Sequence, residues 1–371
     1  MNLKSLLVSS DEKTVRVLRS VLSDLEIAVE HCAGLDAAVH RITRHRFEAI
    51  IVDAANSDEA GDILRATKAA PVNKRALAIV LVENNIGMKG GFELGAHFVL
   101  HKPLAVERAK ASFRAVRALM KSERRLQMRV PIDLPLTCIG ISRSSARTID
   151  LCEGGMAVQF TGRRMEISLR FALELPGAVK GVSDKLEIAG ELAWQDEQYR
   201  AGIRFKDISD SQRSVLRKWL AAHLPEVEPD DPPVLCRLKD LSDGGCYLTT
   251  NSPFPKSSRV ILSWQAAELK VRAIGLVRIM HPEFGMGIEF VQSTAEQKKR
   301  VANFIQALRA AHDPVELQVD PYGLDPAGDE PAHAKSTHSD SLVQLFQEQA
   351  HVSVEAFLGQ MEQARQPQES R

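Results

Sequence analysis

Short apolar runs alternate with amphipathic stretches over the first 120 residues. The apolar runs include residues 49–52, 78–82 and 98–100, and they predict β-strands. Between the runs, apolar positions recur at three-to-four spacing, as in residues 14–22 and 35–43, which predicts helices. Strands that alternate with helices are typical of a parallel sheet covered by helices. We therefore expect an α/β doubly wound domain over residues 1–120.

The last helix of this region has no stop signal at its expected end. Apolar side chains continue at helical spacing from Val106 through Phe113 to Met120, and nothing breaks the pattern before Val130-Pro131. The helix is therefore predicted to run into the next domain, with a group of arginines at or near its end.

Residues 132–223 and 233–310 read as many short strands with glycine turns, and the two stretches resemble each other. Asp150–Gly155 (DLCEGG) recurs as Asp240–Gly245 (DLSDGG), and Gly202–Phe205 (GIRF) recurs as Gly287–Phe290 (GIEF). Each stretch closes with a helical pattern. We expect two small all-β barrels, each with a C-terminal helix.

The C-terminal part changes character. Residues 313–339 are rich in Pro, Asp, Gly and His without periodicity, which predicts a disordered linker. Residues 340–365 are predicted to form one amphipathic helix that either docks on its own domain or mediates self-association or binding of an unidentified protein partner. Its apolar stripe consists of Val343, Phe346, Ala350, Val354, Phe357 and Met361.

Composition narrows the possible functions. Lys plus Arg equals Asp plus Glu at 48 each, so no global positive field favours nucleic acid or a membrane surface. The five cysteines are scattered without CxxC spacing, which argues against a disulfide framework and a metal site. With no signal-peptide pattern and no membrane-length apolar run, a cytoplasmic location is expected. No nucleophile–base pair, catalytic carboxylate pair or Walker-type loop points to an enzyme.

Residues 1–120 resemble the receiver domain of response regulators. Asp53 follows an apolar run where receivers have their phosphate-accepting aspartate, and Lys102-Pro103 stands where they have a lysine-proline pair. The acidic residues that receivers carry after their first strand are replaced by Ser9-Ser10, and their hydroxyl residue at the end of the fourth strand by Val82. The resemblance thus implies a degenerate pseudo-receiver without Mg²⁺, in which Asp53 and Lys102 form at most an ion pair.

The arginines and the repeated phrase carry a second resemblance. RxxxR (Arg125 to Arg129), followed by a [D/N]xSxxG-like phrase, a barrel and a closing helix, resembles the PilZ family of bacterial cyclic di-GMP receptors. Residues 121–225 match with the RxxxR segment. Residues 230–312 match as a second PilZ-like domain without it, because residues 224–233 are acidic and leave no room for the first barrel strand.

This resemblance implies a ligand site in the first copy. Cyclic di-GMP carries two phosphodiesters and two guanines, which suit the guanidinium fork of arginine, a carboxylate acceptor and a close-packed glycine backbone. Cys152 stands where the family has serine, so Cys152→Ser is predicted to tighten binding. The implied ligand residues are Arg124, Arg125, Arg129, Asp150, Cys152 and Gly155, whereas the second-copy residues Asp240, Ser242 and Gly245 are predicted to be structural.

We therefore expect a cytoplasmic cyclic di-GMP-binding signalling effector whose domain arrangement changes on ligand binding. The alternative is a degenerate scaffold that acts by protein contact without nucleotide. A third hypothesis, phosphotransfer at Asp53, would require a working receiver site.

Overall fold

The computed structural model describes residues 3–83, 87–139, 145–161, 168–175, 185–206, 208–223, 231–266, 269–292, 295–311, 314–324, 340–348 and 354–365. The chain forms two compact units. One is Arg124–Pro229, and the other combines Asn2–Glu123 with Asp230–Arg371. The receiver-like region and the second barrel therefore share a unit, and the first barrel is the other.

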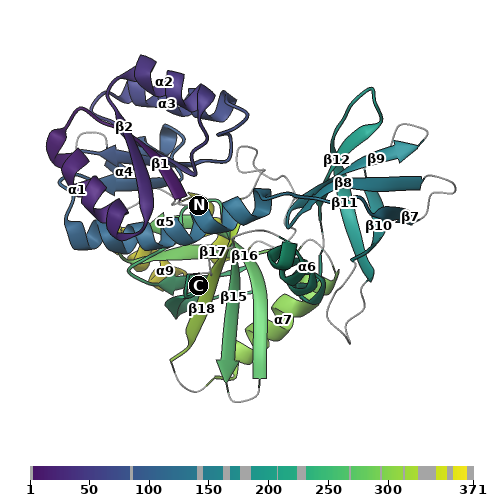
Figure 1. Ribbon diagram of the computed structural model, residues 1–371. Helices are drawn as coiled ribbons and strands as arrows, with labels where there is room; N and C mark the ends of the chain where they lie inside the picture. Colours follow the sequence, from purple (N-terminus) through teal and green to yellow (C-terminus); the bar gives the residue numbers. More distant parts are fainter. Residues whose placement is uncertain are drawn as a thin grey trace. The chain divides into compact units, whose positions relative to one another are not determined.

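The N-terminal region is the predicted α/β doubly wound domain (Figure 1). Its five strands are all parallel, in the order β2-β1-β3-β4-β5. Apolar side chains of α1 and α5 pack on one face of the sheet, and those of α2 and α3 pack on the other. The elements are β1 (Leu3–Val8), α1 (Glu12–Asp24), β2 (Ile27–Cys32), α2 (Leu35–Arg44), β3 (Ala49–Asp53), α3 (Ser57–Ala69), β4 (Leu77–Val82), α4 (Gly87–Glu93), β5 (Phe98–His101) and α5 (Val106–Gln127).

Helix α5 runs past the end of the receiver-like region, as the sequence predicts. It is not amphipathic in its second half, because every residue from Ala118 to Glu123 is buried. The second barrel packs on the side that the receiver sheet leaves free: Ser252 donates to the carbonyl of Ala111 (2.9 Å), and Ser122 donates to the carbonyl of Pro321 (3.2 Å). Helix α5 is thus a core element of both parts of its unit.

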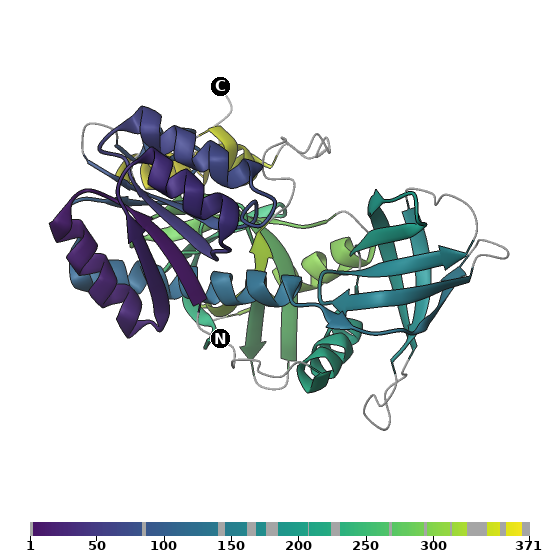
Figure 2. The same ribbon diagram turned by 45° about the horizontal axis from the view of Figure 1, so that its top comes forward.

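The first barrel is closed (Figures 1 and 2). Its sheet order is β6-β8-β7-β10-β11-β12-β9, and β9 pairs back onto β8. Trp219 of the closing helix is buried in the barrel core, as expected for an anchor. The elements are β6 (Val130–Pro131), β7 (Pro135–Ile139), β8 (Ser145–Cys152), β9 (Gly155–Thr161), β10 (Ser168–Glu174), β11 (Lys185–Gln195), β12 (Arg200–Phe205) and α6 (Asp210–His223).

The second barrel is also closed, in the order β13-β14-β17-β16-β15-β18. Five of its strands repeat those of the first barrel in sequence order. The sixth, β18, takes the place of β7, since β7 pairs with β8 and β10 whereas β18 pairs with β13 and β15, antiparallel in each case. The elements are β13 (Val234–Leu241), β14 (Gly245–Thr249), β15 (Ser258–Ala266), β16 (Leu269–His281), β17 (Gly285–Phe290), α7 (Ala295–Arg309) and β18 (Glu316–Leu324).

Strand β18 corrects the prediction of a disordered linker over 313–339. Leu317 and Val319 are fully buried in the barrel core, and Leu324 is nearly so. The missing first strand leaves a gap between β13 and β15 whose backbone groups need partners, and Glu316–Leu324 supplies them. Residues 325–339 of the predicted linker lie outside the described residues.

The C-terminal segment 340–365 holds two helices, α8 (Ser341–Glu348) and α9 (Val354–Arg365), where the sequence predicted one. The stripe residues Val343, Phe346, Phe357 and Met361 are buried. They lie against the second barrel, so of the two alternatives the structure shows docking on the chain's own domain. Ala350 lies outside the described residues.

Candidate ligand-binding site

The arginine segment is held against the first barrel by strand β6. Arg124 and Arg125 lie in the last turn of α5 and are partly buried. The chain then turns, and β6 pairs Val130 with Leu151 and Pro131 with Asp150. This short pairing brings the end of the RxxxR segment beside the end of β8, where the repeated phrase begins.

Arg129 and Asp150 form an ion pair at this junction. The guanidinium Nη1 lies 2.5 Å from Asp150 Oδ1, which also accepts the backbone N–H of Ala157 (3.1 Å). The Arg129 side chain is 45% exposed and that of Asp150 is 23% exposed. The structure therefore brings together two of the predicted ligand residues and leaves them open to solvent.

The glycines of the repeated phrase serve the barrel itself. A Cβ on Gly155 would lie within 3 Å of the Ile203 carbonyl oxygen, and one on Gly245 would meet the equivalent Ile288 oxygen in the same way. Close strand packing thus explains this glycine in both copies. The neighbouring Gly154 lies against the arginine segment, because its Cβ would stand 3.2 Å from the Leu126 carbonyl oxygen.

Cys152 is buried, with 3% of its surface exposed. Burial raises the pKa of its thiol above the usual range, against the opposing effect of Arg129 and of the Gly154 and Gly155 amides. The equivalent Ser242 closes its turn locally: its Oγ accepts the Gly245 N–H (3.1 Å) and donates to the Gly245 carbonyl (3.2 Å). The position therefore has a turn-closing function in the second copy, and the structure gives Cys152 the same place.

Trp194 is a candidate site residue that the sequence did not indicate. Strand register places Asp150, Ala157, Gly202 and Trp194 side by side across four strands. The indole lies over Gly202, where a Cβ would collide with it, and Trp194 is 48% exposed. The sequence feature that could have indicated it is a tryptophan near the end of one strand followed by a glycine, Gly202 of GIRF, at the matching position of the next strand. We call this line the motif row of the first barrel.

In the receiver-like region, Asp53 is enclosed by an ion pair. Lys102 Nζ lies 2.9 Å from Asp53 Oδ1, and Ser9 Oγ donates to Asp53 Oδ2 (2.7 Å). The Asp53 and Lys102 side chains are only 4% and 10% exposed, and Lys102 pairs with Glu83 as well (3.1 Å). The pKa of Lys102 is raised above its usual value: burial opposes this, but the carboxylates of Asp53 and Glu83 outweigh it.

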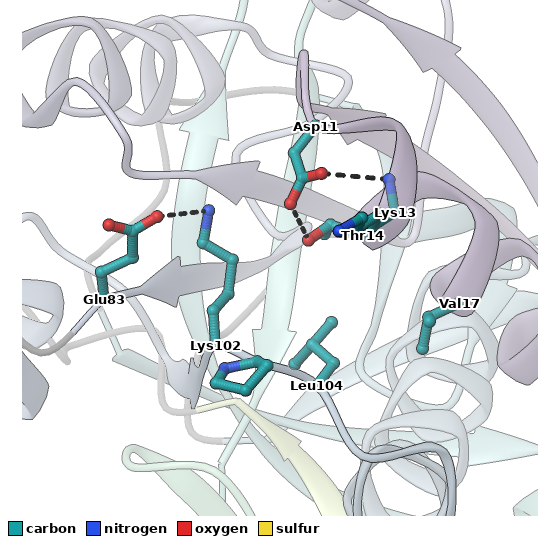
Figure 3. A pocket seen from close by; sticks show the side chains of 8 residues that line it. Asp11, Lys13, Thr14, Val17, Glu83, Lys102 and Leu104 are labelled. Atoms are coloured by element: carbon teal, nitrogen blue, oxygen red, sulfur yellow. Dashed lines mark hydrogen bonds and ion pairs between the residues drawn. The ribbon is translucent and has the colours of Figure 1, made fainter.

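A pocket of about 620 Å³ opens beside this pair and is lined by residues 11, 13, 14, 17, 83 and 102–104 (Figure 3). Asp11 is the acid nearest to a receiver's metal-binding position, but it caps α1, accepting from Lys13 N (3.0 Å) and Thr14 Oγ1 (2.6 Å). The Thr14 hydroxyl is the largest cause of its lowered pKa. Across the described ranges, no cluster of three or more His, Cys, Asp or Glu is placed to hold a metal ion.

The first repeat is a closed barrel with arginines and a glycine turn at one edge and a helix after its last strand. The model of the PilZ domain family matches residues 123–222 and again residues 224–307. The chain therefore contains two tandem PilZ domains, and these imply a relationship to cyclic di-GMP receptor signalling. The second match ends before β18.

Solved structures similar to the chain include receiver domains. One is the receiver domain of a sensor histidine kinase from Pseudomonas aeruginosa, with 21% identity over 32% of this chain and 95% of the other, at a TM-score of 0.28. Another is a chemotaxis response regulator of Vibrio cholerae, with 21% identity over 29% of this chain and 92% of the other, at a TM-score of 0.26. The receiver-like fold itself follows from the parallel 2-1-3-4-5 strand order.

No curated protein matches the chain significantly. Among the helices that the structure describes, none is both long and apolar enough to cross a membrane.

Proposed function

We propose that the protein is a cytoplasmic signalling effector that binds cyclic di-GMP at its first PilZ domain. The observation that carries the proposal is the exposed pairing of Arg129 with Asp150 at the junction of the arginine segment and the barrel. In the second PilZ domain, the equivalent Asp240 accepts the N–H of its neighbour Leu241 (2.7 Å).

The motif row suits the chemistry of this ligand. The guanidinium of Arg129 can donate two hydrogen bonds to guanine O6 and N7 or pair with a phosphodiester, and Asp150 can accept from guanine N1 and N2. The exposed indole of Trp194 offers a flat face on which a purine can stack. On binding, the ligand exchanges the Arg129–Asp150 pair for contacts to itself, so each group keeps a partner.

The position of the arginines links binding to domain arrangement. Arg124 begins one compact unit, and Glu123 ends the segment that belongs to the other. A ligand that draws Arg125 and Arg129 onto the barrel acts directly beside this connection. The arrangement changes if the ligand has different affinities for two positions of the segment.

Titration calorimetry of the full chain with cyclic di-GMP tests the binding. We expect saturable heat, and none with cyclic di-AMP, whose adenines present an amino donor where guanine presents O6. Absence of heat with cyclic di-GMP rejects the proposal and favours the scaffold alternative. Small-angle scattering with and without ligand tests the second part: an unchanged profile at saturation would leave binding intact but reject rearrangement.

Cys152→Ser is predicted to change the stability of the turn more than the affinity for the ligand. A serine hydroxyl can make the two turn hydrogen bonds that Ser242 makes, so Cys152→Ser should raise the free energy of unfolding of the first domain by about 1 kcal/mol. Because the position is buried, the dissociation constant of cyclic di-GMP should change less than about threefold, in place of the tightening expected from sequence. A gain above tenfold would put the side chain in contact with the ligand.

Phosphorylation of the receiver-like region is expected to fail. Asp53 is enclosed by Lys102 and Ser9, and Asp11 is engaged as a helix cap, so Mg²⁺ lacks the acidic ligands that phosphoryl transfer requires. Incubation with acetyl phosphate and Mg²⁺ should leave the intact mass unchanged. A phosphorylated species that disappears in Asp53→Asn would restore the phosphotransfer hypothesis.

A further inference from the structure

The second PilZ domain has its own motif row. Register places Asp240, Tyr247, Gly287 and Ile279 side by side across four strands. These positions are equivalent, in order, to Asp150, Ala157, Gly202 and Trp194 of the first domain. The two rows can therefore be compared position by position.

The row of the second domain is covered by the C-terminal helices. A Cβ on Gly287 would stand 2.5 Å from Ile279 Cγ2 and 2.6 Å from the Phe346 ring, whereas the three nearest atoms to a Cβ on Gly202 all belong to the Trp194 indole. Phe357 lies on the same surface, with ring-centroid separations of 5.2 Å from Tyr247 and 4.8 Å from His281. Tyr247, Phe346 and Phe357 form a compact apolar cluster with Ile279, Leu342 and Met361.

A polar contact fixes the start of α8 on the motif turn. Asp340 caps the helix, because its Oδ1 accepts the N–H groups of Leu342 (3.1 Å) and Val343 (3.2 Å). Its Oδ2 accepts the N–H of Gly244 (2.8 Å), in the middle of the repeated phrase. One carboxylate thus joins the helix to the turn.

We propose that this docking surface is the second domain's counterpart of the ligand-binding face of the first, and that the chain's own α8–α9 pair occupies it in place of a nucleotide. On the second domain, helices α8 and α9 cover the face that corresponds to the proposed nucleotide-binding face of the first domain. That comparison rests on the proposed function, whereas the docking itself does not.

The side chains of the second domain's motif row explain why a helix pair, and not a nucleotide, lies on this surface. A phosphodiester needs cations, but the stretch before β13 is acidic and RxxxR is missing. The turn still presents the Gly244 N–H, which a capping aspartate can use, and Tyr247 and Ile279 offer apolar area where the first domain has Ala157 and the exposed Trp194. About fifteen residues separate β18 from Asp340, and a tether of this length raises the effective concentration of the pair into the millimolar range.

The test is to displace the α8–α9 pair from the surface by substitution in the full chain. Phe346→Asp with Phe357→Asp places charges in the apolar cluster and should release the pair while leaving the surface intact. A fluorescent synthetic peptide of residues 338–367 is then added as the probe. We expect it to bind the double variant at least about 100-fold more tightly than the wild type, whose surface is occupied.

A glycine substitution tests the specificity of the surface. The atoms nearest to a Cβ on Gly244 belong to the helix pair, at 2.8 Å (Val343) and 2.9 Å (Asp340). Gly244→Ala in the double variant should therefore weaken peptide binding at least tenfold, whereas the matched Gly154→Ala in the first domain should leave it unchanged. No peptide binding by the double variant, or equal binding with Gly244→Ala, overturns the proposal.

Hydrogen exchange keeps the proposal testable if the double variant fails to fold. In the otherwise wild-type chain, Gly244→Ala should make the amides of α8 and α9 exchange at least tenfold faster while β13–β17 stay protected. Unchanged protection of both helices overturns the docking. These readouts need no nucleotide, so failure of the wild type to bind cyclic di-GMP would reject the proposed function alone.

Discussion

Arg129→Ala is expected to weaken binding of cyclic di-GMP by at least about 100-fold. Two charge-assisted hydrogen bonds from one guanidinium contribute about 3 kcal/mol or more, and about 1.4 kcal/mol corresponds to a factor of ten in affinity. The substitution also leaves Asp150 without its cation beside an incoming phosphodiester, which adds repulsion. Titration calorimetry of both proteins at one ionic strength measures the difference.

Arg147→Ala is the matched control for this experiment. Arg147 lies on the same strand as Asp150 and pairs with the exposed Asp133, outside the motif row. Its loss should leave the affinity within about twofold, because exposed pairs contribute little. Arg129→Lys keeps the charge but not the fork and should fall between wild type and alanine. Equal affinities for Arg129→Ala and the wild type would remove the arginine from the ligand site.

Glu123→Ala should have the largest effect on stability. The Glu123 carboxylate is 4% exposed and receives two hydrogen bonds from Arg75, at 2.9 and 3.1 Å, and a third from the backbone N–H of Leu324. Removing it takes two hydrogen bonds from the Arg75 guanidinium and leaves a buried amide of β18 without its acceptor, at a cost of about 3 kcal/mol. For a unit of this size, thermal unfolding should shift down by roughly 2–4 °C per kcal/mol.

Calorimetric scans should assign this shift to the unit that contains the receiver-like region and the second barrel, because Glu123, Arg75 and Leu324 all belong to it. Arg65→Ala serves as the control: its pair with Asp62 is exposed on both sides, so the transition should move by about 1 °C or less. A shift as small as the control's would mean that the carboxylate does not hold α5 between its two neighbours.

The sequence predicted those elements whose signals are local or repeated. Parallel strands and helices followed from apolar periodicity, and the two barrels followed from the recurrence of DLCEGG as DLSDGG and of GIRF as GIEF. The extension of α5 to Gln127 followed from the absence of a helix breaker before Pro131. The juxtaposition of Arg129 with Asp150 could be anticipated only through the family resemblance.

The features that escaped prediction depend on contacts between distant segments. Strand β18 alternates apolar Leu317 and Val319 with polar residues, but Pro321 and Gly323 within the segment read as loop signals. Lys121, Ser122 and Glu123 are polar helix residues that are buried because the second barrel packs there, which no local pattern indicates. Trp194 drew no attention as a site residue, since it and Asp150 are 44 residues apart in the chain and are linked only through the strand register across Ala157 and Gly202.

Strand β18 closes a barrel whose sequence lacks both the RxxxR segment and the first strand. In the first domain, the arginine segment and β7 both precede Asp150 on the same stretch of chain. The stretch before Asp240, residues 224–239, contains no RxxxR sequence, and without β18 the second barrel would lack one strand. Such a barrel would expose the edges of β13 and β15, which invite aggregation. Strand β18, which follows the closing helix α7 in the chain, fills this place in the sheet by pairing with both β13 and β15. Because β18 lies beyond residue 307, where the family match ends, a fragment cut there would lack this strand and should aggregate.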